Sequence, residues 1–324
     1  MTISHVSYAD TVIAIADLTY DKLVCLKKKE EILDEVIITP NSVFDFLLTS
    51  IKKTEEKLIL PIKLNAYYKE FIKNNNSFIR FCDADVIYHL RQDKKENLSI
   101  NGSVVGSRAY RIPAVEANEI DFEIISPIGY QKALKFYKPS KIGRFTNLDA
   151  PKKYDYFLQE YKKSYAVRVN PKEHEDGLFE ANILINKYDS TVTSINFLIP
   201  EHRSHLTKER NAIVAKVKIT SNSGYLYYSY TPGGNIFLSH SRLEYTLSVK
   251  NKNTDDLLSF ISGVNIYEIP EDQEPFPKSK AYKNKSIYKR GTDYLSAYWL
   301  EKSLITLTEK EKKIIQEISN LNSE

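Results

Sequence analysis

Apolar residues at helical spacing predict helices near both ends of the chain. The sequence from Pro40 is typical of a helix start, with Asn41 or Ser42 as the N-cap, and apolar residues then recur every three or four positions to about Lys57. The same criteria predict helices over residues 65–72, 254–261, 292–304 and 309–318, the last of them capped by Thr308.

Alternating or short apolar runs rich in β-branched and aromatic residues predict strands elsewhere. Near the start of the chain these runs are residues 11–16, 22–26, 35–38 and 78–90. The central part has more of them: residues 120–125, 178–187, 191–199, 212–220, 225–230, 236–239 and 243–249. Turn-forming residues at 189–190, 222–224 and 232–234 separate neighbouring runs, which indicates an antiparallel meander.

These elements predict the fold class and the organisation of the chain. We expect an α+β protein with a curved, mainly antiparallel central sheet over about residues 103–249 and helices from the N-terminal third and the C-terminal end packed against it. Three regions follow: an N-terminal α+β region over 1–100, an antiparallel β-rich body over 101–265, and a C-terminal region over 266–324. The C-terminal region combines an acidic, proline-rich linker, a basic segment and the last helices.

The composition fits a folded globular chain, with 42% hydrophobic and 27% charged residues. No stretch approaches the roughly 18 consecutive apolar residues of a membrane helix, and the first residues lack the pattern of a signal peptide. Cys25 and Cys82 are too few for a disulfide framework or a zinc site, and both are expected to be buried free thiols. These features together predict a cytoplasmic location.

Positive charge is unevenly distributed, and this changes the functional picture. The chain carries a formal net charge of +4, yet residues 132–168 hold ten basic and three acidic residues, and residues 278–290 hold six basic residues and no acid. Aromatic residues are interleaved with both stretches: Phe136, Tyr137, Phe145, Tyr154, Tyr156, Phe157, Tyr161, Tyr165, Tyr282 and Tyr288.

Cations that neutralise phosphates, together with aromatic faces that stack on unpaired bases, predict nucleic-acid binding. The expected contacts are Lys132, Lys135, Lys138, Lys141, Arg144, Lys162, Lys163, Lys283, Lys285, Lys289 and Arg290, joined by Arg108, Arg111 and Arg242. The alternative is an ordinary solvated lysine face whose aromatic neighbours point into the core.

Histidines near the predicted meander are the candidate catalytic groups. Alternation places His240, Arg242 and Glu244 on one face of a strand, which suits acid–base chemistry and equally suits a cross-strand ion pair. His202 and His205 lie in a charged connection after Pro200, where they either act as a pair or belong to a solvated loop.

A cluster of arginines and acids precedes the central strands. Glu119, Asp121 and Glu123 would share one face of a strand and suit a divalent metal, while Arg108 or Arg111 would bind phosphate. The alternative is that these arginines pair with those carboxylates. No cofactor or metal is assigned, because P-loop, dinucleotide, zinc, GxSxG and kinase motifs are all absent from the sequence. The nuclease-like spacing of Asp149 or Asp155 with Glu160 and Lys162 is weak.

The resulting prediction is a nucleic-acid-binding protein, either a DNA- or RNA-acting enzyme of the restriction or defence type, such as a nuclease, or a non-catalytic subunit of a ribonucleoprotein or replication assembly. Whether it is an enzyme stays open at this point. Protein partners or self-association are the further expectation, with a protein–protein scaffold as a third class.

Overall fold

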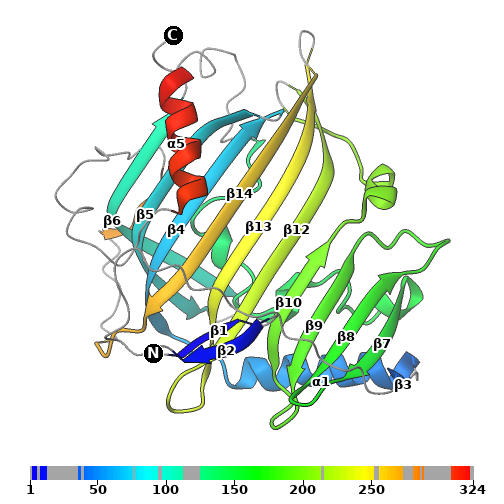
Figure 1. The fold of residues 1–324 in the computed structure, drawn as a ribbon. Helices are drawn as coiled ribbons and strands as arrows, with labels where there is room; N and C mark the ends of the chain where they lie inside the picture. Colours follow the sequence, from blue (N-terminus) through cyan, green and yellow to red (C-terminus); the bar gives the residue numbers. More distant parts are fainter. Residues whose placement is uncertain are drawn as a thin grey trace.

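The computed structural model describes residues 2–5, 8–12, 36–37, 40–75, 77–93, 97–111, 125–212, 215–251, 255–272, 280–284, 287 and 308–321. One large antiparallel sheet dominates this part of the chain (Figure 1). A separate two-stranded hairpin is formed by β1 (Thr2–His5) and β2 (Tyr8–Val12).

The large sheet contains twelve described strands. They are β3 (Val36–Ile37), β4 (Ile62–Asn74), β5 (Ser77–Gln92), β6 (Leu98–Arg111), β7 (Tyr154–Glu160), β8 (Ser164–Pro171), β9 (Glu180–Asn186), β10 (Val192–Leu198), β11 (Arg210–Asn211), β12 (Lys216–Tyr230), β13 (Ile236–Lys250) and β14 (Asp255–Glu268). Their spatial order is β3-β7-β8-β9-β10-β12-β13-β14-β4-β5-β6, with β11 paired to β12. The late strand β14 therefore joins the early strand β4 to the middle of the sheet.

Within the described residues, two α-helices flank the sheet. The helix α1 (Pro40–Glu56) packs against β7 and β10 on the core face, where Phe44 contacts the ring of Tyr156. The helix α5 (Glu309–Leu321) lies over β4 and β5 in Figure 1 and contacts β5 and β6. Its Glu311 pairs with Lys69, whose neighbours Tyr68 and Glu70 face the core, so α5 covers the opposite face.

An irregular segment, residues 125–153, fills the core face of the sheet. It contains the short 3-10 helices η2 (Lys132–Leu134), η3 (Pro139–Ile142) and η4 (Ala150–Lys152). A buried segment without regular structure leaves carbonyl groups that need donors. Tyrosine hydroxyls supply them: Tyr88 donates to the carbonyl of Tyr130, Tyr228 to that of Phe136, and Tyr156 to that of Phe145, at 2.7–2.9 Å.

This hydrogen bonding gives a structural role to several of the 23 tyrosines of the chain. A buried tyrosine supplies apolar ring area and one hydroxyl donor at a fixed reach. Tyr88, Tyr130 and Tyr137 are fully buried, and burial raises the pKa of each, which keeps the hydroxyl protonated as a donor. The tyrosines therefore attach the irregular segment to the sheet.

The predicted α+β class is wrong, because regular structure in the described part is overwhelmingly this one sheet. Of the segments predicted as helices, residues 65–72 lie in β4, and residues 255–261 of the segment 254–261 lie in β14. In β4 the buried residues Leu64, Ala66 and Tyr68 alternate at a period of two, and pairing with β5 and β14 decides in favour of a strand.

The sheet is also wider than predicted, since β4, β5 and β14 belong to it. Residues 222–224, predicted as a turn, continue through the middle of β12. The helices predicted at 40–57 and 309–318 are confirmed as α1 and α5, and the turn at 232–234 joins β12 to β13. The elements predicted at 22–26, 120–125 and 292–304 lie outside the described residues.

Candidate functional site

His240, Arg242 and Glu244 lie along one face of β13, as their alternation predicts. This is the face away from the core, since Leu243 and Tyr245 between and beside them are buried. Arg242 is half-exposed and its Nη2 lies 3.6 Å from Oε2 of Glu244, so the two form an ordinary surface ion pair.

His240 sits between two strands and is only partly accessible. Its Nδ1 is 2.5 Å from Oδ1 of Asn265 on β14, and its ring centroid is 5.8 Å from that of Tyr225 on β12. Burial lowers the pKa of His240, while the hydrogen bond with Asn265 acts in the opposite direction. The imidazole is therefore held neutral over more of the pH range than a free histidine.

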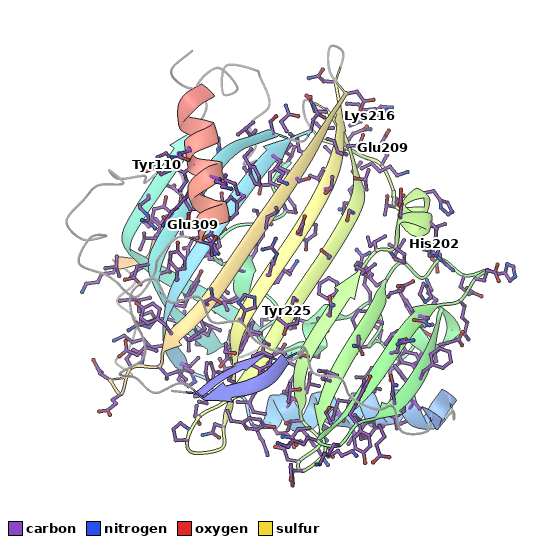
Figure 2. All side chains as sticks on the ribbon, in the orientation of Figure 1. Tyr110, His202, Glu209, Lys216, Tyr225 and Glu309 are labelled. Carbon is purple, nitrogen blue, oxygen red and sulfur yellow. The ribbon has the colours of Figure 1, made fainter. Side chains whose placement is uncertain are left out.

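His202 and His205 lie elsewhere, in the 3-10 helix η5 (Glu201–Leu206) between β10 and β11. Both are exposed, and Nδ1 of His205 is 2.8 Å from the carbonyl oxygen of His202. Figure 2 shows His202 beside the sheet, away from Tyr225, which contacts His240. The structure thus does not bring the three histidines together.

Arg108 on β6 is buried and paired with Asp83 on β5. Its Nε lies 2.7 Å from Oδ1 of Asp83, and Nη2 contacts Oδ2 of the same carboxylate. Tyr67 donates a hydrogen bond to Asp83 as well, at 2.5 Å. Arg111 ends β6, and the predicted metal face at Glu119, Asp121 and Glu123 lies outside the described residues. Arg108 is therefore a structural residue, unavailable to phosphate.

The basic residues of 132–163 are distributed over different surroundings. Lys132 donates to the carbonyl of Ser126, and Lys135 donates to the hydroxyl of Tyr245. Arg144 lies over the ring of Phe179. The others point from η3 or from the β7–β8 turn: Lys138 is half-buried, and Lys141, Lys162 and Lys163 are exposed.

Four of the aromatic residues interleaved with this stretch face the core. Tyr137, Phe145, Tyr154 and Tyr156 are at most 4% exposed, so none of these four presents a ring to an outside base. The other four, Phe136, Phe157, Tyr161 and Tyr165, are partly buried. In the second basic stretch Lys283 is exposed, and Tyr282 packs edge-on against Tyr130. Lys285, Lys289 and Arg290 lie outside the described residues.

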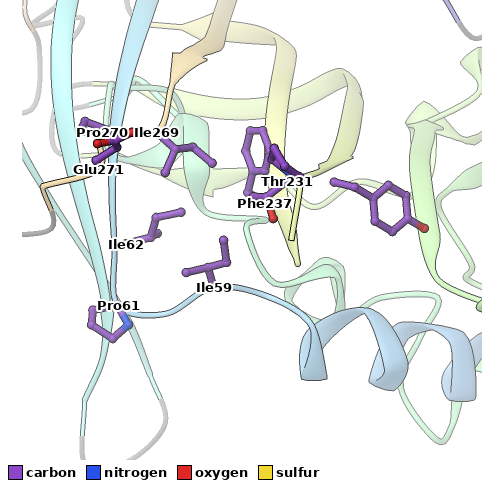
Figure 3. Close-up of a pocket in the computed structure, with 10 residues that line it drawn as sticks. Ile59, Pro61, Ile62, Thr231, Phe237, Ile269, Pro270 and Glu271 are labelled. Atoms are coloured by element: carbon purple, nitrogen blue, oxygen red, sulfur yellow. The ribbon is translucent and has the colours of Figure 1, made fainter. Parts of the chain in front are cut away.

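Sequence reasoning missed a pocket at one end of the sheet, which we call the rim pocket. It has a volume of about 550 Å³ and is formed by the α1–β4 connection, the β12–β13 hairpin and the chain after β14 (Figure 3). Its lining is Ile59, Pro61, Ile62, Tyr230, Thr231, Pro232, Phe237, Ile269, Pro270 and Glu271. Only Glu271 among these carries a charge.

Backbone hydrogen bonds hold the walls of the rim pocket together. The amide of Ile59 donates to the carbonyl of Ile236 at 3.2 Å, and the amide of Ile236 donates to the carbonyl of Lys57 at 2.8 Å. The hairpin tip is closed by a bond from Gly234 to Thr231, with Gly234 at φ +81°. The only sequence signals for this site are apolar residues beside prolines, which local patterns do not distinguish from core.

One lining residue of the rim pocket, Tyr230, belongs to a hydrogen-bonded polar group. The hydroxyl of Tyr230 accepts a hydrogen bond from Asn186 and lies 2.5 Å from the hydroxyl of Thr191. Asp189 joins this group and pairs with Lys57 at 2.7 Å. Glu271 lies beside Ile269 and Pro270, apart from Thr231 and Phe237 (Figure 3). An apolar interior bordered by a few polar groups is the usual make-up of a small-molecule site.

The described residues contain no group of three or more histidine, cysteine or acidic side chains arranged to hold a metal ion. None of the helices in that same part of the chain has the length and apolarity required to span a membrane.

Comparison with known proteins gives only remote structural likenesses. No family model and no curated protein matches the sequence. A putative outer membrane lipoprotein-sorting protein domain from Vibrio parahaemolyticus is similar at a TM-score of 0.27 and 9% identity, covering 74% of this chain and 96% of that one. A LolA superfamily protein from Nitrosomonas europaea (TM-score 0.22, 7% identity, 72% and 96%) and the Pseudomonas aeruginosa MucA/MucB complex (0.21, 9%, 71% and 94%) are similar to it too.

The nucleic-acid function predicted from charge is wrong, and with it the nuclease, restriction and defence interpretations and the alternative of a nucleic-acid-binding subunit. Four of the aromatic residues on which it rested, Tyr137, Phe145, Tyr154 and Tyr156, are core residues, and Lys132, Lys135 and Arg144 are engaged within the protein. The nucleic-acid partner is withdrawn for the same reasons.

The predicted cytoplasmic location is withdrawn as well. The buried thiol on which that prediction partly rested has a packing origin, since Cys82 faces the core from β5. At these TM-scores the structural likenesses carry no argument about the function or location of this chain.

Proposed function

We propose that this protein binds an amphiphilic molecule, with the hydrocarbon chain in the rim pocket and the polar end beside Tyr230. The observation that carries the proposal is the lining itself: an open space of about 550 Å³ bordered by isoleucine, proline, phenylalanine and tyrosine side chains. Sites for small organic ligands have volumes of roughly 300–1,000 Å³ and mainly apolar walls.

The surroundings of the pocket favour an amphiphile over a wholly apolar ligand. Tyr230 is 38% exposed, and its hydroxyl already belongs to a hydrogen-bonded group with Asp189 and Thr191. A polar end placed there would meet hydrogen-bonding partners, whereas each methylene removed from water inside the pocket contributes about 0.8 kcal/mol. The polar end of such a molecule would thus lie beside hydrogen-bonding groups, and its hydrocarbon chain would lie against apolar side chains.

Titration with saturated fatty acids of increasing chain length, followed by calorimetry, tests the proposal. Affinity should rise about fourfold with each added methylene until the pocket is full, because about 0.8 kcal/mol per methylene corresponds to that factor. Ile269→Asp, which places a carboxylate in the lining, should weaken binding at least about tenfold.

Leu198→Asp is the matched control. Leu198 is 40% exposed on β10 and takes no part in the pocket. The Leu198→Asp substitution introduces the same charge as Ile269→Asp, and it should leave the affinity for the fatty acid unchanged. Binding that does not depend on chain length, or that Ile269→Asp leaves intact, would refute the rim pocket as the binding site.

A further inference from the structure

Two cations of the irregular segment lie over rings of one aromatic cluster, which contains Phe136, Phe179 and Phe197. Lys135 follows η2, and its Nζ is 2.6 Å from the hydroxyl of Tyr245 and 4.5 Å from the centroid of the Phe136 ring. Arg144 follows η3, and its Cζ is 5.3 Å from the centroid of the Phe179 ring. The Phe136 and Phe179 rings both pack edge-on against Phe197 of β10, at 5.8 and 5.7 Å.

Neither cation has an acidic partner among the described residues. Other lysines of the sheet and of the same segment do: Lys152 pairs with Asp149, Lys153 with Asp176 and Lys250 with Asp255, each at 2.7–2.8 Å. Lys135 and Arg144 contact aromatic rings and one hydroxyl instead. Two positive charges that share a low-dielectric surface without a counter-ion destabilise each other.

The charge of Arg144 acts on the pKa of both Lys135 and Tyr245. Burial and, after it, the charge of Arg144 lower the pKa of Lys135 to about 8. Burial raises the pKa of Tyr245 to about 12, and the charge of Arg144 acts against that rise. Lys135, Tyr245 and Arg144 therefore form one electrostatic group.

Asn222, which lies beside Tyr245, has a buried side-chain oxygen without a hydrogen-bond donor among the described residues. This observation is independent of the two cations. Asn222 is 8% exposed, and its Oδ1 has no hydrogen-bond partner within the described part of the chain. In the register of β12 and β13 it lies directly opposite Tyr245, so both side chains project from the same face of the sheet. Buried side-chain amides are ordinarily paired, and those that are not call for an explanation such as a bound ligand.

We propose that Lys135, Arg144 and Asn222 form a binding site for a phosphate group. A phosphate dianion would supply the counter-charge that both cations lack, with the guanidinium and ammonium as charge-assisted donors. The Oδ1 of Asn222, which needs a donor, would accept a hydrogen bond from the P–OH group that inorganic phosphate or a singly ionised phosphate monoester carries. The aromatic rings exclude water on the protein side and so strengthen these bonds.

This phosphate site is separate from the rim pocket. Tyr245 lies eight residues along β13 from Phe237, which is about 27 Å of strand. The proposal therefore goes beyond the binding of an amphiphile and does not depend on it. Two sources of the same chemistry fit: free phosphate or a phosphate monoester, and the phosphate of a lipid headgroup.

The first arm of the test is calorimetric titration of the full chain with inorganic phosphate at pH 8. Lys135→Met keeps the packing on the rings and removes the charge, and Arg144→Gln removes the second charge at an exposed position. Each should weaken binding at least tenfold. Lys141→Gln, an exposed cation of the same segment, is the matched control and should bind as the parent does.

Proton linkage separates this site from non-specific anion binding. A bound anion raises the pKa of Lys135, so phosphate binding at pH 8 should take up a fraction of a proton, measured from the heat in buffers of different ionisation enthalpy. The Lys135→Met variant should bind without that proton uptake. If phosphate bound non-specifically, the proton uptake would be the same in the parent and in Lys135→Met.

The second arm measures binding to phosphatidylcholine vesicles with and without phosphatidic acid. Phosphate binding that both variants lose and the control retains supports a site for free phosphate or a monoester. Binding to phosphatidic acid vesicles alone, lost in the same variants, supports the lipid headgroup. Absence of binding in both arms, or binding that persists in Lys135→Met and Arg144→Gln, overturns the proposal.

Discussion

The buried ion pair between Arg108 and Asp83 gives the sharpest test of the energetics of the sheet. Arg108 is 5% exposed and Asp83 is fully buried, on the adjacent strands β6 and β5. Replacing Arg108 by Met keeps most of the side-chain volume but leaves the carboxylate without its cation. Removing one partner of a buried pair costs about 3–5 kcal/mol, a large share of the roughly 5–15 kcal/mol that stabilises a typical domain.

The pH dependence of this loss has a definite sign. Burial raises the pKa of Asp83 above its ordinary value of 3.8, while Arg108 opposes the rise. Without Arg108 the folded-state pKa rises further above the unfolded one, so protonation of Asp83 favours the folded state. The stability linked to that proton is present at low pH and is lost as pH rises through the folded-state pKa. The deficit of Arg108→Met should therefore shrink as pH falls towards about 4.

Urea unfolding followed by circular dichroism measures both effects. The matched control is Arg242→Met, since Arg242 is half-exposed and 3.6 Å from its acid, and a surface pair contributes at most about 1 kcal/mol. In Asp83→Asn/Arg108→Met no charge is left unpaired, so this double variant should recover more than half of the loss. If Arg108→Met costs no more than the control, or if its deficit does not depend on pH, the pair is solvated and the reasoning fails.

Two further predictions concern the middle of the sheet. A methyl group on Gly224 would lie 2.3 Å from Cζ of Phe197. Gly224→Ala should therefore lower the free energy of unfolding, measured in urea, by about 1–3 kcal/mol. The control is Gly233→Ala in the hairpin, where the nearest atom is 3.9 Å away and the free energy of unfolding should change little. In an NMR titration His240 should show a pKa below 6.5, and Asn265→Ala should lower it further because the hydrogen bond that opposes burial is lost; a rise would contradict the assigned contact.

The sequence predicts the elements whose structure local spacing decides. The apolar repeat after Pro40 gives α1, and the β-branched runs before and after residues 189–190 give β9 and β10 with their tight turn at Ser190. In these segments the side-chain period and the turn residues agree, so no distant contact is needed to decide them.

Local patterns fail where a distant strand decides the structure. Residues 65–72 and 254–261 contain apolar residues at spacings that fit a helix, but the strands in which they lie, β4 and β14, are neighbours in the sheet and pair along their length. The predicted turn at 222–224 fails for a related reason: Gly224 lies beneath the ring of Phe197 on β10, where a side chain would not fit. The sequence alone does not distinguish a glycine that is required by close packing from a glycine that is required by a turn.

The site was mispredicted because the charge and aromatic content of a stretch do not show whether its side chains point to the core or to solvent. Tyr137 and Tyr156 lie among lysines in the sequence, yet their rings point to the core and their hydroxyls bond to main-chain carbonyls. The rim pocket is built from segments that begin near residues 59, 230 and 269, and only the fold brings them together.

The pairing of β14 with β4 also sets the order in which the chain can complete its fold. Val264 lies opposite Tyr68, so one side of β4 has no partner until residue 268 has left the ribosome. During synthesis the first hairpins are an open template for strand addition, and loop closure over such a separation is slow. Correct assembly of the nascent chain therefore depends on protecting this edge until the last long strand arrives.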